Sequence, residues 1–313
     1  MAVMKATRDA FGETLVKLGE KYPEVVVLDA DLAKSTKSEA FLKAFPDRFF
    51  EMGIAEANMI GTAAGLALAG KVSFACSFAC FITGRFDQIR ISVAYANANV
   101  RVVGSHAGVA IGEDGYSQMG LEDVALMRSL PGMVVMQPAD DVETAAMMEY
   151  LCTHQGPAYL RTTRQKLERV NPEDYTYRFG KAVELRQGGT DAVIFATGGE
   201  VAFALHAAEA LAKEGHQVGV VNVHTLKPLD TETILRLSEQ ARLVVTAEDH
   251  QVIGGLGSAV AETLAEAGLG RRLVRIGLQD VFGESGTPEQ LLRHFQLDAE
   301  GIAAQVRGAL QGV

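Results

Sequence analysis

A single carboxylate, Glu56, stands where a short apolar run gives way to a stretch of small residues. The segment FFEMGIAEANMIGTAAGLALAG (49–70) predicts a strand ending near Gly53 and a helix of small residues from about Ala55 to Ala69. A carboxylate at the beginning of a helix is stabilised by the helix dipole, and this alone would explain Glu56. The alternative is that the carboxyl group takes part in chemistry.

Positive charge is scarce in this chain. Its 313 residues include 29 Lys and Arg against 39 Asp and Glu, which gives a net charge of −10. Nucleic acids and anionic membrane surfaces bind basic patches, so both classes of partner are disfavoured. A phosphorylated ligand would have to be held by a few placed arginines, because the planar guanidinium fork binds phosphate oxygens in pairs.

The sequence GGLGS (254–258) opens a helix-forming stretch and has two explanations. Its backbone N–H groups could hold an anion at the helix N-terminus. Its spacing differs from that of dinucleotide-binding loops, and no P-loop lysine accompanies it. Close packing of the helix against a sheet is therefore the favoured explanation.

The three cysteines, Cys76, Cys80 and Cys152, lack the spacing of metal ligands. Cys76 and Cys80 lie in the apolar run VSFACSFACF and are predicted to be buried thiols, which suits a reducing compartment. Lys5, Arg8 and other charges interrupt the apolar segment that a signal peptide would need. The sequence also contains no uninterrupted run of about 18 apolar residues, the length needed to span a membrane. We therefore expect a cytoplasmic protein without membrane contacts.

The elements that must position these residues follow an alternating pattern. Runs of β-branched residues alternate with amphipathic or Ala-rich stretches, which is typical of βα units around a parallel sheet. The fold class predicted is α/β, with two tandem doubly wound domains and a mostly parallel sheet in each. In the first domain the expected strands are 25–31, 49–50, 72–78, 100–106, 133–139 and 157–163, and the expected helices are 6–22, 38–45, 55–69, 83–96, 120–129 and 140–153. In the second, a strand (191–199) and a helix (201–215) begin an alternation that ends with the strand 272–278.

The chain length suits two domains of roughly 150 residues each. Residues 1–165 are assigned to the first domain and 190–313 to the second. The segment 166–189 between them is polar and irregular, with Asn171-Pro172 and Gly188-Gly189 as turn signals, and is assigned as a linker.

The segment around Glu56 resembles the pyrimidine-binding domain of transketolases and of the related ketoacid-dehydrogenase beta subunits. AEDHQVIGGLGSAV (247–260) is similar to the C-terminal domain of the same family, and the resemblance extends from Lys5 to about Val306. It implies that residues 1–165 are a thiamine-diphosphate pyrimidine-binding domain and that residues 190–313 are a transketolase-type C-terminal domain.

The resemblance implies a role in cofactor activation for Glu56. In the family, a carboxyl group at this position bonds to a pyrimidine nitrogen of thiamine diphosphate and so favours the tautomer in which the cofactor acts as its own base. Phe81 matches the aromatic residue that stacks on the pyrimidine, with Phe78 as a second candidate. Asp31 matches a position close to the cofactor and the subunit interface.

The resemblance also implies a grip for a sugar phosphate. The family holds the phosphate with two arginines, a serine and a histidine drawn from distant segments, and their counterparts here are Arg8, Ser35, His106 and Arg164. Taken singly, Arg8 could be a solvated helix residue and His106 a loop hydrogen-bonder. Asp114 in GEDG matches the aspartate that binds a substrate hydroxyl, although Glu113 lies beside it. Gln118 and His106 are the other two residues expected to contact the sugar.

The sequence departs from the family at several positions. The usual Arg-Glu-His triplet is Ala55-Glu56-Ala57 here, and Gly84 replaces an aromatic residue found in many relatives. Gln118 replaces a histidine that contacts the transferred ketol group, and glutamine cannot carry a proton at neutral pH. This puts the usual donor sugar in doubt.

The largest departure is the absence of the domain that holds the cofactor's diphosphate through a metal. Its signature, Gly-Asp-Gly followed by an Asn-Asn pair, does not occur, and GEDGYSQ aligns with the substrate loop instead. Met1 stands immediately before the pyrimidine domain, which fits a separate gene product. We therefore expect no metal ligands in this chain. Mg²⁺ or Ca²⁺ would be bound by an N-terminal transketolase subunit, in an α2β2 assembly with each cofactor at an α–β interface.

These implications favour a subunit of a thiamine-diphosphate-dependent transketolase, which moves a two-carbon ketol unit between sugar phosphates. A deoxyxylulose-phosphate-synthase-like enzyme shares the phosphate grip but is normally one long chain. A ketoacid-dehydrogenase beta subunit is naturally split but would give Arg8 and Arg164 no evident purpose. A scaffold or regulatory subunit is the non-enzymatic alternative, and it has no physical need for Glu56 or Asp114.

Overall fold

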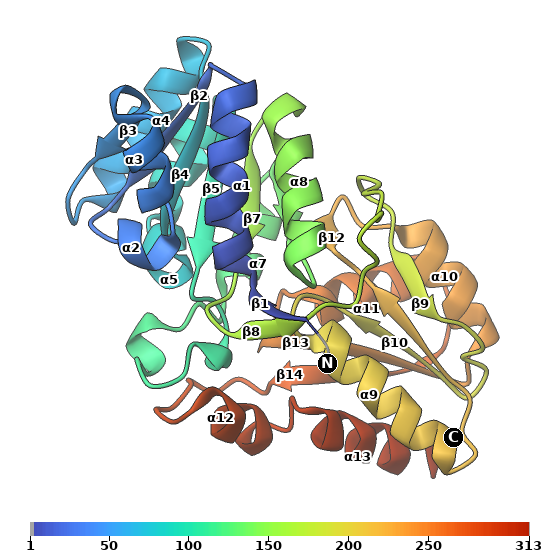
Figure 1. The fold of residues 1–313 in the computed structure, drawn as a ribbon. Helices are drawn as coiled ribbons and strands as arrows, with labels where there is room; N and C mark the ends of the chain where they lie inside the picture. The colour runs from blue at the N-terminus through green and yellow to red at the C-terminus, as the bar shows by residue number, and fades with distance from the viewer. Residues whose placement is uncertain (1–2, 313) are drawn as a thin grey trace.

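A seven-stranded sheet forms the centre of the N-terminal half of the computed structural model, which describes residues 3–312 (Figure 1). Its strand order is β12-β6-β7-β5-β4-β2-β3, and all neighbours pair in parallel except β12 with β6. The strands of this half are β2 (Val25–Asp29), β3 (Phe49–Glu51), β4 (Val72–Phe78), β5 (Val100–Ser105), β6 (Val134–Met136) and β7 (Ala158–Arg161). The helices are α1 (Thr7–Lys21), α2 (Ala33–Thr36), α3 (Glu39–Ala44), α4 (Glu56–Leu68), α5 (Ala79–Thr83), α6 (Phe86–Gln88), α7 (Asp123–Ser129) and α8 (Asp141–Thr153).

The five-stranded sheet of the C-terminal half has the order β14-β13-β10-β11-β9. Only β9 runs antiparallel to its neighbour. Its strands are β9 (Val183–Arg186), β10 (Ala192–Ala196), β11 (Val218–Asn222), β13 (Leu243–Gln251) and β14 (Arg272–Leu278). Its helices are α9 (Glu200–Lys213), α10 (Thr231–Gln240), α11 (Leu256–Glu266), α12 (Pro288–His294) and α13 (Ala299–Leu310). The predicted α/β fold with mostly parallel sheets in two parts is confirmed.

Strand β2 shows why these segments fold as they do. All five of its residues are buried, and successive side chains point to opposite faces of the sheet. Val25 and Val27 pack with Phe11 of α1, whereas Val26 and Leu28 belong to the core on the α4 face. A sheet covered by helices on both faces needs continuous apolar runs of this kind.

Two predicted elements differ from the structure. The single helix predicted over 83–96 is wrong: α5 ends at Thr83, α6 covers Phe86–Gln88, and a π-helical segment follows over Ile89–Tyr95. Gly84 lies at the break, where its lack of a side chain weakens helix formation.

The segment 166–189 is not irregular throughout. Lys166–Glu168 forms β8 and pairs with β1 (Met4–Ala6), while β9 adds an edge strand to the second sheet. Both strands are short and only partly buried, so they lack the apolar run by which buried strands are recognised.

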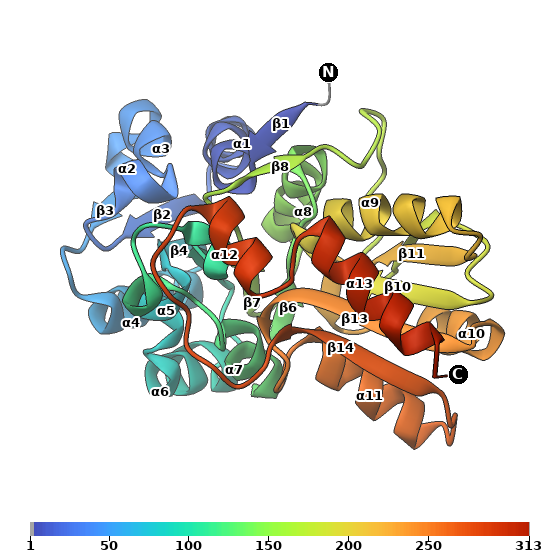
Figure 2. The same ribbon diagram turned by 90° about the horizontal axis from the view of Figure 1, so that it is seen from below.

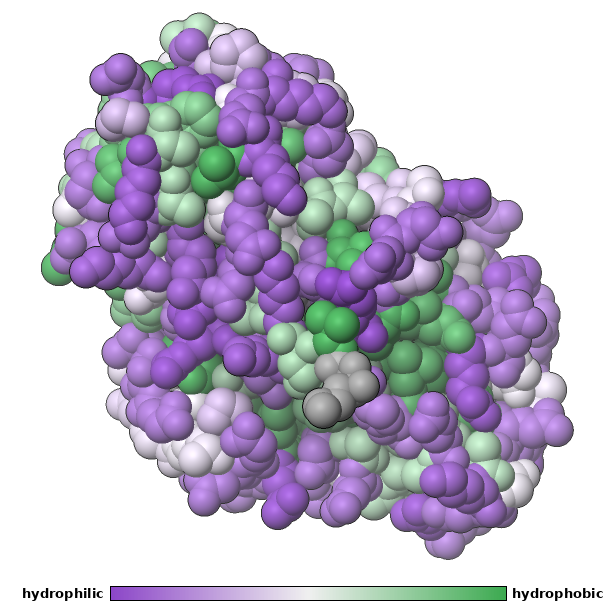
Figure 3. All heavy atoms as spheres, viewed as in Figure 1, coloured by the Kyte–Doolittle hydropathy of each residue, from purple (hydrophilic) through white to green (hydrophobic). Residues whose placement is uncertain are grey.

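The two halves are joined by more than the connecting segment. Strand β12 (Thr225–Lys227) belongs by sequence to the C-terminal half but pairs with β6 of the first sheet. One hydrophobic core contains Met59 and Val102 together with Phe195 and Val244 of the C-terminal half. Figure 3 shows a largely hydrophilic face, with hydrophobic residues visible near the junction of the halves and also on the N-terminal half. The halves are therefore packed as one body.

Candidate active site

Glu56 is the first residue of α4, at the carboxyl end of the first sheet. Gly53, with a φ of 67°, lets the chain turn from β3 toward the helix. The Glu56 side chain is only 7% exposed, and Ser77 Oγ of β4 donates to its Oε1 at 3.3 Å. Its position at the helix start satisfies the dipole explanation, but the carboxyl group also lines a pocket. The two explanations are therefore compatible.

This pocket has a volume of about 300 Å³ and brings together three residues that the sequence assigned to the cofactor. Its lining consists of Ala30, Asp31, Leu32, Ile54, Glu56, Phe81 and Arg85. A carboxyl group and an aromatic ring thus share one small cavity, which is the combination that an aminopyrimidine requires. The residues present fit that part of thiamine diphosphate.

Phe78 does not line the pocket and instead lies behind Phe81. Its ring stacks on Phe81, with centroids 5.5 Å apart, and on His106, with centroids 3.7 Å apart. Phe78 is 5% exposed and lies between Phe81 of the pocket and His106, and it is not part of the pocket lining. Its assignment to the cofactor stays a prediction.

His106 follows β5 and is 2% exposed. Arg8 Nη1 lies 2.7 Å from His106 Nε2, and Ser105 Oγ lies 2.7 Å from His106 Nδ1. Because a guanidinium can only donate, Nε2 must accept and the ring proton must reside on Nδ1, where it donates to Ser105. Burial, and then the charges of Arg8, Arg164 and Lys37, lower the pKa of His106 to about 3. The imidazole is therefore neutral.

The four residues predicted to hold a phosphate lie on four separate segments. Arg8 of α1 donates to the backbone oxygen of Ser35 in α2 at 3.0 Å and reaches His106 through the same Nη1. Its Nε is buried and has no hydrogen-bond partner. Burial is the main cause that lowers the Arg8 pKa, and Arg164 adds to it. The Nε–H group of Arg8 is thus still available to a ligand, and the guanidinium of Arg164 lies near enough to affect the Arg8 pKa.

Arg164 reaches the same place from the end of β7. Its Nη1 forms an ion pair with Asp114 Oδ2 at 3.2 Å, and each side chain is about one-third exposed. Asp114, not Glu113, is therefore the carboxylate that pairs with Arg164. A bound sugar phosphate would meet both partners of this pair.

Gln118 lies on the same loop as Asp114, in a short 3₁₀ turn over Tyr116–Gln118. Its backbone oxygen accepts from Cys80 Sγ of α5, the helix that carries Phe81, at 3.1 Å. The side chain of Gln118 is only partly buried. The loop thus runs beside the pocket wall that contains Phe81.

Asp31, Lys37 and His106 are non-glycine residues in the left-handed backbone region, with φ values of 64°, 72° and 55°. Such conformations cost energy and cluster at functional sites. The Asp31 N–H donates to Glu51 Oε1 at 2.8 Å, and Gly53 N–H donates to the same atom at 3.0 Å. Glu51 therefore fixes the rim of the pocket.

Sequence reasoning missed Glu51, Ser77 and Ile54. Ile54 is 84% exposed although it lines the pocket. Glu51 could have been noticed as a carboxylate two residues before Gly53, but Ser77 lies in a buried apolar run and gives no signal in the sequence. Its contact with Glu56 depends on the pairing of distant segments.

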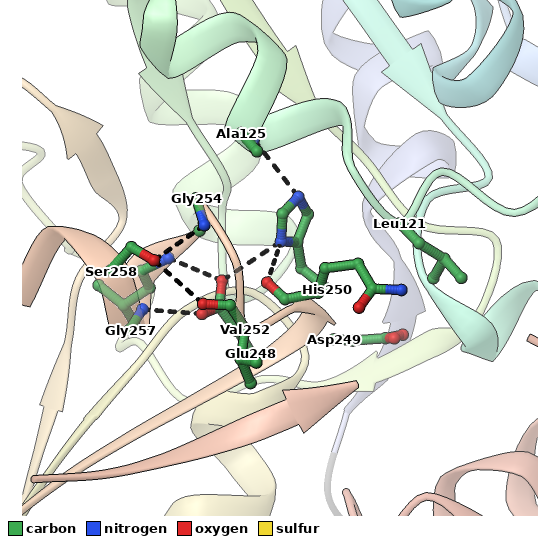
Figure 4. Close-up of polar contacts among 12 residues, drawn as sticks. Leu121, Ala125, Glu248, Asp249, His250, Val252, Gly254, Gly257 and Ser258 are labelled. Atoms are coloured by element: carbon green, nitrogen blue, oxygen red, sulfur yellow. Dashed lines mark hydrogen bonds and ion pairs between the residues drawn. The ribbon is translucent and has the colours of Figure 1, made fainter. Parts of the chain in front are cut away.

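The glycine motif 254–258 holds a carboxylate of its own chain. Glu248 Oε2 accepts from Leu256 N–H at 2.7 Å, and Oε1 accepts from Gly257 N–H at 2.8 Å, at the first turn of α11 (Figure 4). A Cβ on Gly255 would collide with Glu248. The N–H groups that could have held a ligand are therefore occupied, and the close-packing explanation agrees with this geometry.

Among residues 3–312, no group of three or more His, Cys, Asp and Glu side chains could hold a metal ion. No helix in the same range has the length and hydrophobicity needed to cross a membrane.

Two family descriptions match the chain. The transketolase pyrimidine-binding domain matches residues 3–169, and the transketolase C-terminal domain matches residues 180–302. Together they cover both sheets and every residue of the site described above.

Curated relatives include chains of similar length. A putative transketolase C-terminal section of Methanocaldococcus jannaschii is 47% identical over 307 residues, covering 97% of this chain and 96% of the relative. The 6-deoxy-6-sulfo-D-fructose transketolase subunit SqwH of Clostridium sp. strain MSTE9 is 44% identical, with coverages of 94% and 91%. Human transketolase is 38% identical, but the matched region spans only 49% of that protein.

A solved structure described as a split gene transketolase, inactive beta4 tetramer, superposes with a TM-score of 0.89. Its sequence is 46% identical, and the match covers 98% of this chain and 99% of that chain.

Proposed function

The chain belongs to the transketolase family, and from this we propose that it is the cofactor-activating and substrate-binding subunit of a split thiamine-diphosphate-dependent transketolase. The reaction is transfer of a two-carbon ketol unit from a ketose phosphate to an aldose phosphate. The observation that carries the proposal is the unbroken path of contacts from Glu56 and Phe81, in the pocket, through Phe78 to His106 and Arg8. A cofactor pocket and an anion grip are thereby held side by side.

In the pocket, Glu56 binds the pyrimidine ring through its carboxyl group while Phe81 provides the stacking surface. Ser77 holds the Glu56 carboxyl group in place, and Asp31 lies on the pocket wall. When bound, thiamine diphosphate supplies the electron sink and the nucleophile of ketol transfer. The contribution of this chain is to set the protonation of the pyrimidine and to exclude water from its apolar face.

On the side of Phe78 away from the pocket, Arg8, Ser35, His106 and Arg164 form the site for the anionic end of the sugar. Arg8 and Arg164 supply charge, and neutral His106, whose two ring nitrogens are bonded to Arg8 and Ser105, holds Arg8 in place. Asp114 and Gln118 bind hydroxyl groups nearer the reacting carbon. A sulfonate is also a tetrahedral oxyanion, so the sulfosugar in the name of the Clostridium relative is a second donor class to assay.

We propose that a separate chain supplies the diphosphate site together with Mg²⁺ or Ca²⁺ and its ligands, in an α2β2 heterotetramer. The support is threefold. The matched region is about half of human transketolase, the cofactor pocket is open and edged by the exposed Ile54, and α4 and the π-helical segment present Leu68, Ile91 and Tyr95 to the surface. A partner that covers these apolar groups would also close the pocket. The three free thiols suit the cytoplasm.

The test is reconstitution. The tagged chain is purified from its native host, co-purifying chains are identified by mass spectrometry, and the one with the diphosphate-binding signature is recombined with it. We expect ketol transfer only from the mixture, with thiamine diphosphate and Mg²⁺ or Ca²⁺ present. Tight binding of cofactor and metal by the chain alone would contradict the split arrangement, and an assembled complex without ketol transfer would contradict the activity.

A further inference from the structure

The loop between β5 and α7 (residues 106–120, here the substrate loop) carries His106, Asp114 and Gln118. It is closed at its base, where Gly108 N–H donates to Gly120 O at 2.9 Å. Between these glycines the chain forms only two short 3₁₀ turns and no longer element. Something outside the loop must therefore fix its shape.

The C-terminal half supplies that fixed point through Asp249 of β13. Asp249 Oδ1 accepts from Val109 N–H at 2.8 Å, and Oδ2 accepts from Ala110 N–H at 3.2 Å. The carboxylate is 7% exposed, and a Cβ at position 108 would collide with it, so Gly108 is needed for the approach. Two backbone groups of the substrate loop are thus held by one side chain that lies about 140 residues away in the chain.

The apolar side of the loop is also built into the C-terminal half. Four buried side chains of the loop, and Leu121 directly after it, belong to the same hydrophobic core as β10, β13 and α13; the four are Val109, Ala110, Ile111 and Met119. Helix α12 packs against the 3₁₀ turn Val109–Ile111, and Figure 2 shows it beside this segment. Cβ atoms at Gly112 and Gly115 would meet Pro288 and Ser285. The loop therefore has one face on the C-terminal half and its polar residues on the other.

The C-terminal end of the loop, at Gly120, is tied to the same strand. Arg161 Nη2 of β7 donates to Gly120 O and to the backbone oxygen of Asp249, both at 2.9 Å. Arg161 is itself fixed by a buried ion pair with Asp123, at 2.7 Å. Residue 249 therefore helps to fix both ends of the loop. Its side chain binds the N–H groups of Val109 and Ala110, and its backbone oxygen shares the Arg161 donor with Gly120.

We propose that Asp249 is a positioning residue for ketol transfer: it holds the substrate loop in the shape that directs Asp114 and Gln118 toward the sugar. The inference rests on the proposed function for the identity of the substrate, but the contact itself does not. Hydrogen bonds to a charged acceptor are among the stronger ones in proteins, and leaving buried backbone N–H groups without an acceptor is costly. The C-terminal half thereby contributes to the reaction by fixing the shape of this loop.

Glu248 provides a matched control beside it. Both carboxylates lie on β13, both are buried, and each accepts two backbone N–H groups of a glycine-rich segment. They point in opposite directions, Glu248 toward the start of α11 and Asp249 away from it (Figure 4). A general loss of stability should appear in both variants, whereas loop positioning should be lost only in one.

The first measurement is amide hydrogen exchange on the full chain carrying Asp249→Asn. The amide nitrogen of asparagine is a donor, so one of the two loop N–H groups loses its acceptor. We expect exchange over residues 108–120 to accelerate by about tenfold or more. In Glu248→Gln we expect faster exchange at the start of α11 and wild-type exchange in the substrate loop. If Asp249→Asn is not recovered folded, Asp249→Ser, which keeps one smaller acceptor, replaces it.

The second measurement is steady-state kinetics with the reconstituted complex. Asp249→Asn should raise the KM for the ketose phosphate about tenfold, lower kcat by less, and leave the half-saturating thiamine diphosphate concentration unchanged. Glu248→Gln should change none of the three. Equal effects of both variants, or wild-type loop exchange in Asp249→Asn, would overturn the inference. If the wild-type complex lacks ketol transfer, the proposed function fails, while the exchange comparison still decides whether Asp249 holds the loop.

Discussion

The substrate loop (106–120) and the glycine motif 254–258 are two glycine-rich segments at the ends of strands, and both present backbone N–H groups to a carboxylate of β13. In the motif, Glu248 takes up the N–H groups of Leu256 and Gly257, and the chain continues directly into α11. In the loop, Asp249 takes up the N–H groups of Val109 and Ala110, and the chain continues through residues 111–122 before α7 begins at Asp123. The same kind of bond therefore caps the start of a helix in one place and shapes the substrate loop in the other.

The two segments differ in the side chains that are still available for binding after their backbone N–H groups have bonded to the carboxylate. Beyond its carboxylate contact, the motif offers glycine, leucine and serine, and Ser258 Oγ is used to accept from Gly254 N–H. The loop still offers Asp114 and Gln118, of which Asp114 is one-third exposed. Glycine-rich sequence alone thus indicates close backbone approach, whereas chemistry has to be argued from the polar side chains that the approach leaves free.

The change with the largest expected effect is Glu56→Gln. Glu56 lies in the N-terminal half, which also contains the substrate loop. Loss of the acid–base function should reduce kcat by about 10² to 10⁴-fold, because an amide cannot share a proton with the pyrimidine. Steady-state turnover of the reconstituted complex measures this, with co-elution of the two subunits as the check on assembly. Wild-type turnover in a complex that assembles would leave the scaffold explanation standing.

A smaller effect is expected from Arg8→Gln, which removes one charge from the grip but leaves the cofactor pocket intact. We expect the KM for a ketose phosphate to rise by about 10- to 100-fold, since a charge-assisted hydrogen bond is lost, with little change for a ketose that lacks the phosphate. Kinetics with the two substrates separate anion binding from turnover.

The matched control for Arg8 is Arg275 of the C-terminal half, whose Nη1 donates to Val252 O beside the glycine motif at 2.9 Å. Arg275→Gln should leave both KM values at the wild-type level. A similar increase in both variants would mean that the two halves do not differ in the way proposed.

The sequence predicts the fold well because buried parallel strands are recognisable as apolar runs such as VVVLD (25–29). It does not predict β8, β9 or β12, since short edge strands are defined by the strand beside them and not by their own composition. Glu56, Phe81 and Asp31 were placed together by family resemblance, and the structure brings them into one pocket. Asp249 could not be assigned in this way, because its partners are backbone groups of a distant loop.

The smallest effect that we predict concerns two buried histidines, one in each half. Burial is the main cause that lowers the pKa of His106 to about 3 and of His250 to about 4. Around His106 the charged neighbours Arg8, Arg164 and Lys37 all lower the pKa further. Around His250 the contributions of Asp123 and Arg161 oppose each other. The two rings are thus neutral for partly different reasons.

Arg8→Gln should therefore raise the pKa of His106 and leave that of His250 unchanged, which NMR titration of the imidazole C–H resonances would measure. In the unfolded chain a histidine binds a proton near pH 6.5, whereas the folded wild type keeps His106 neutral to about pH 3. Between these values the unfolded state binds more protons, so this histidine's contribution to stability is lost as the pH falls below about 6.5. The loss should be smaller in Arg8→Gln, because its folded state accepts the proton at a higher pH. An equal rise at both histidines would show that Arg8 acts through a general loosening of the fold and not through its charge at the grip.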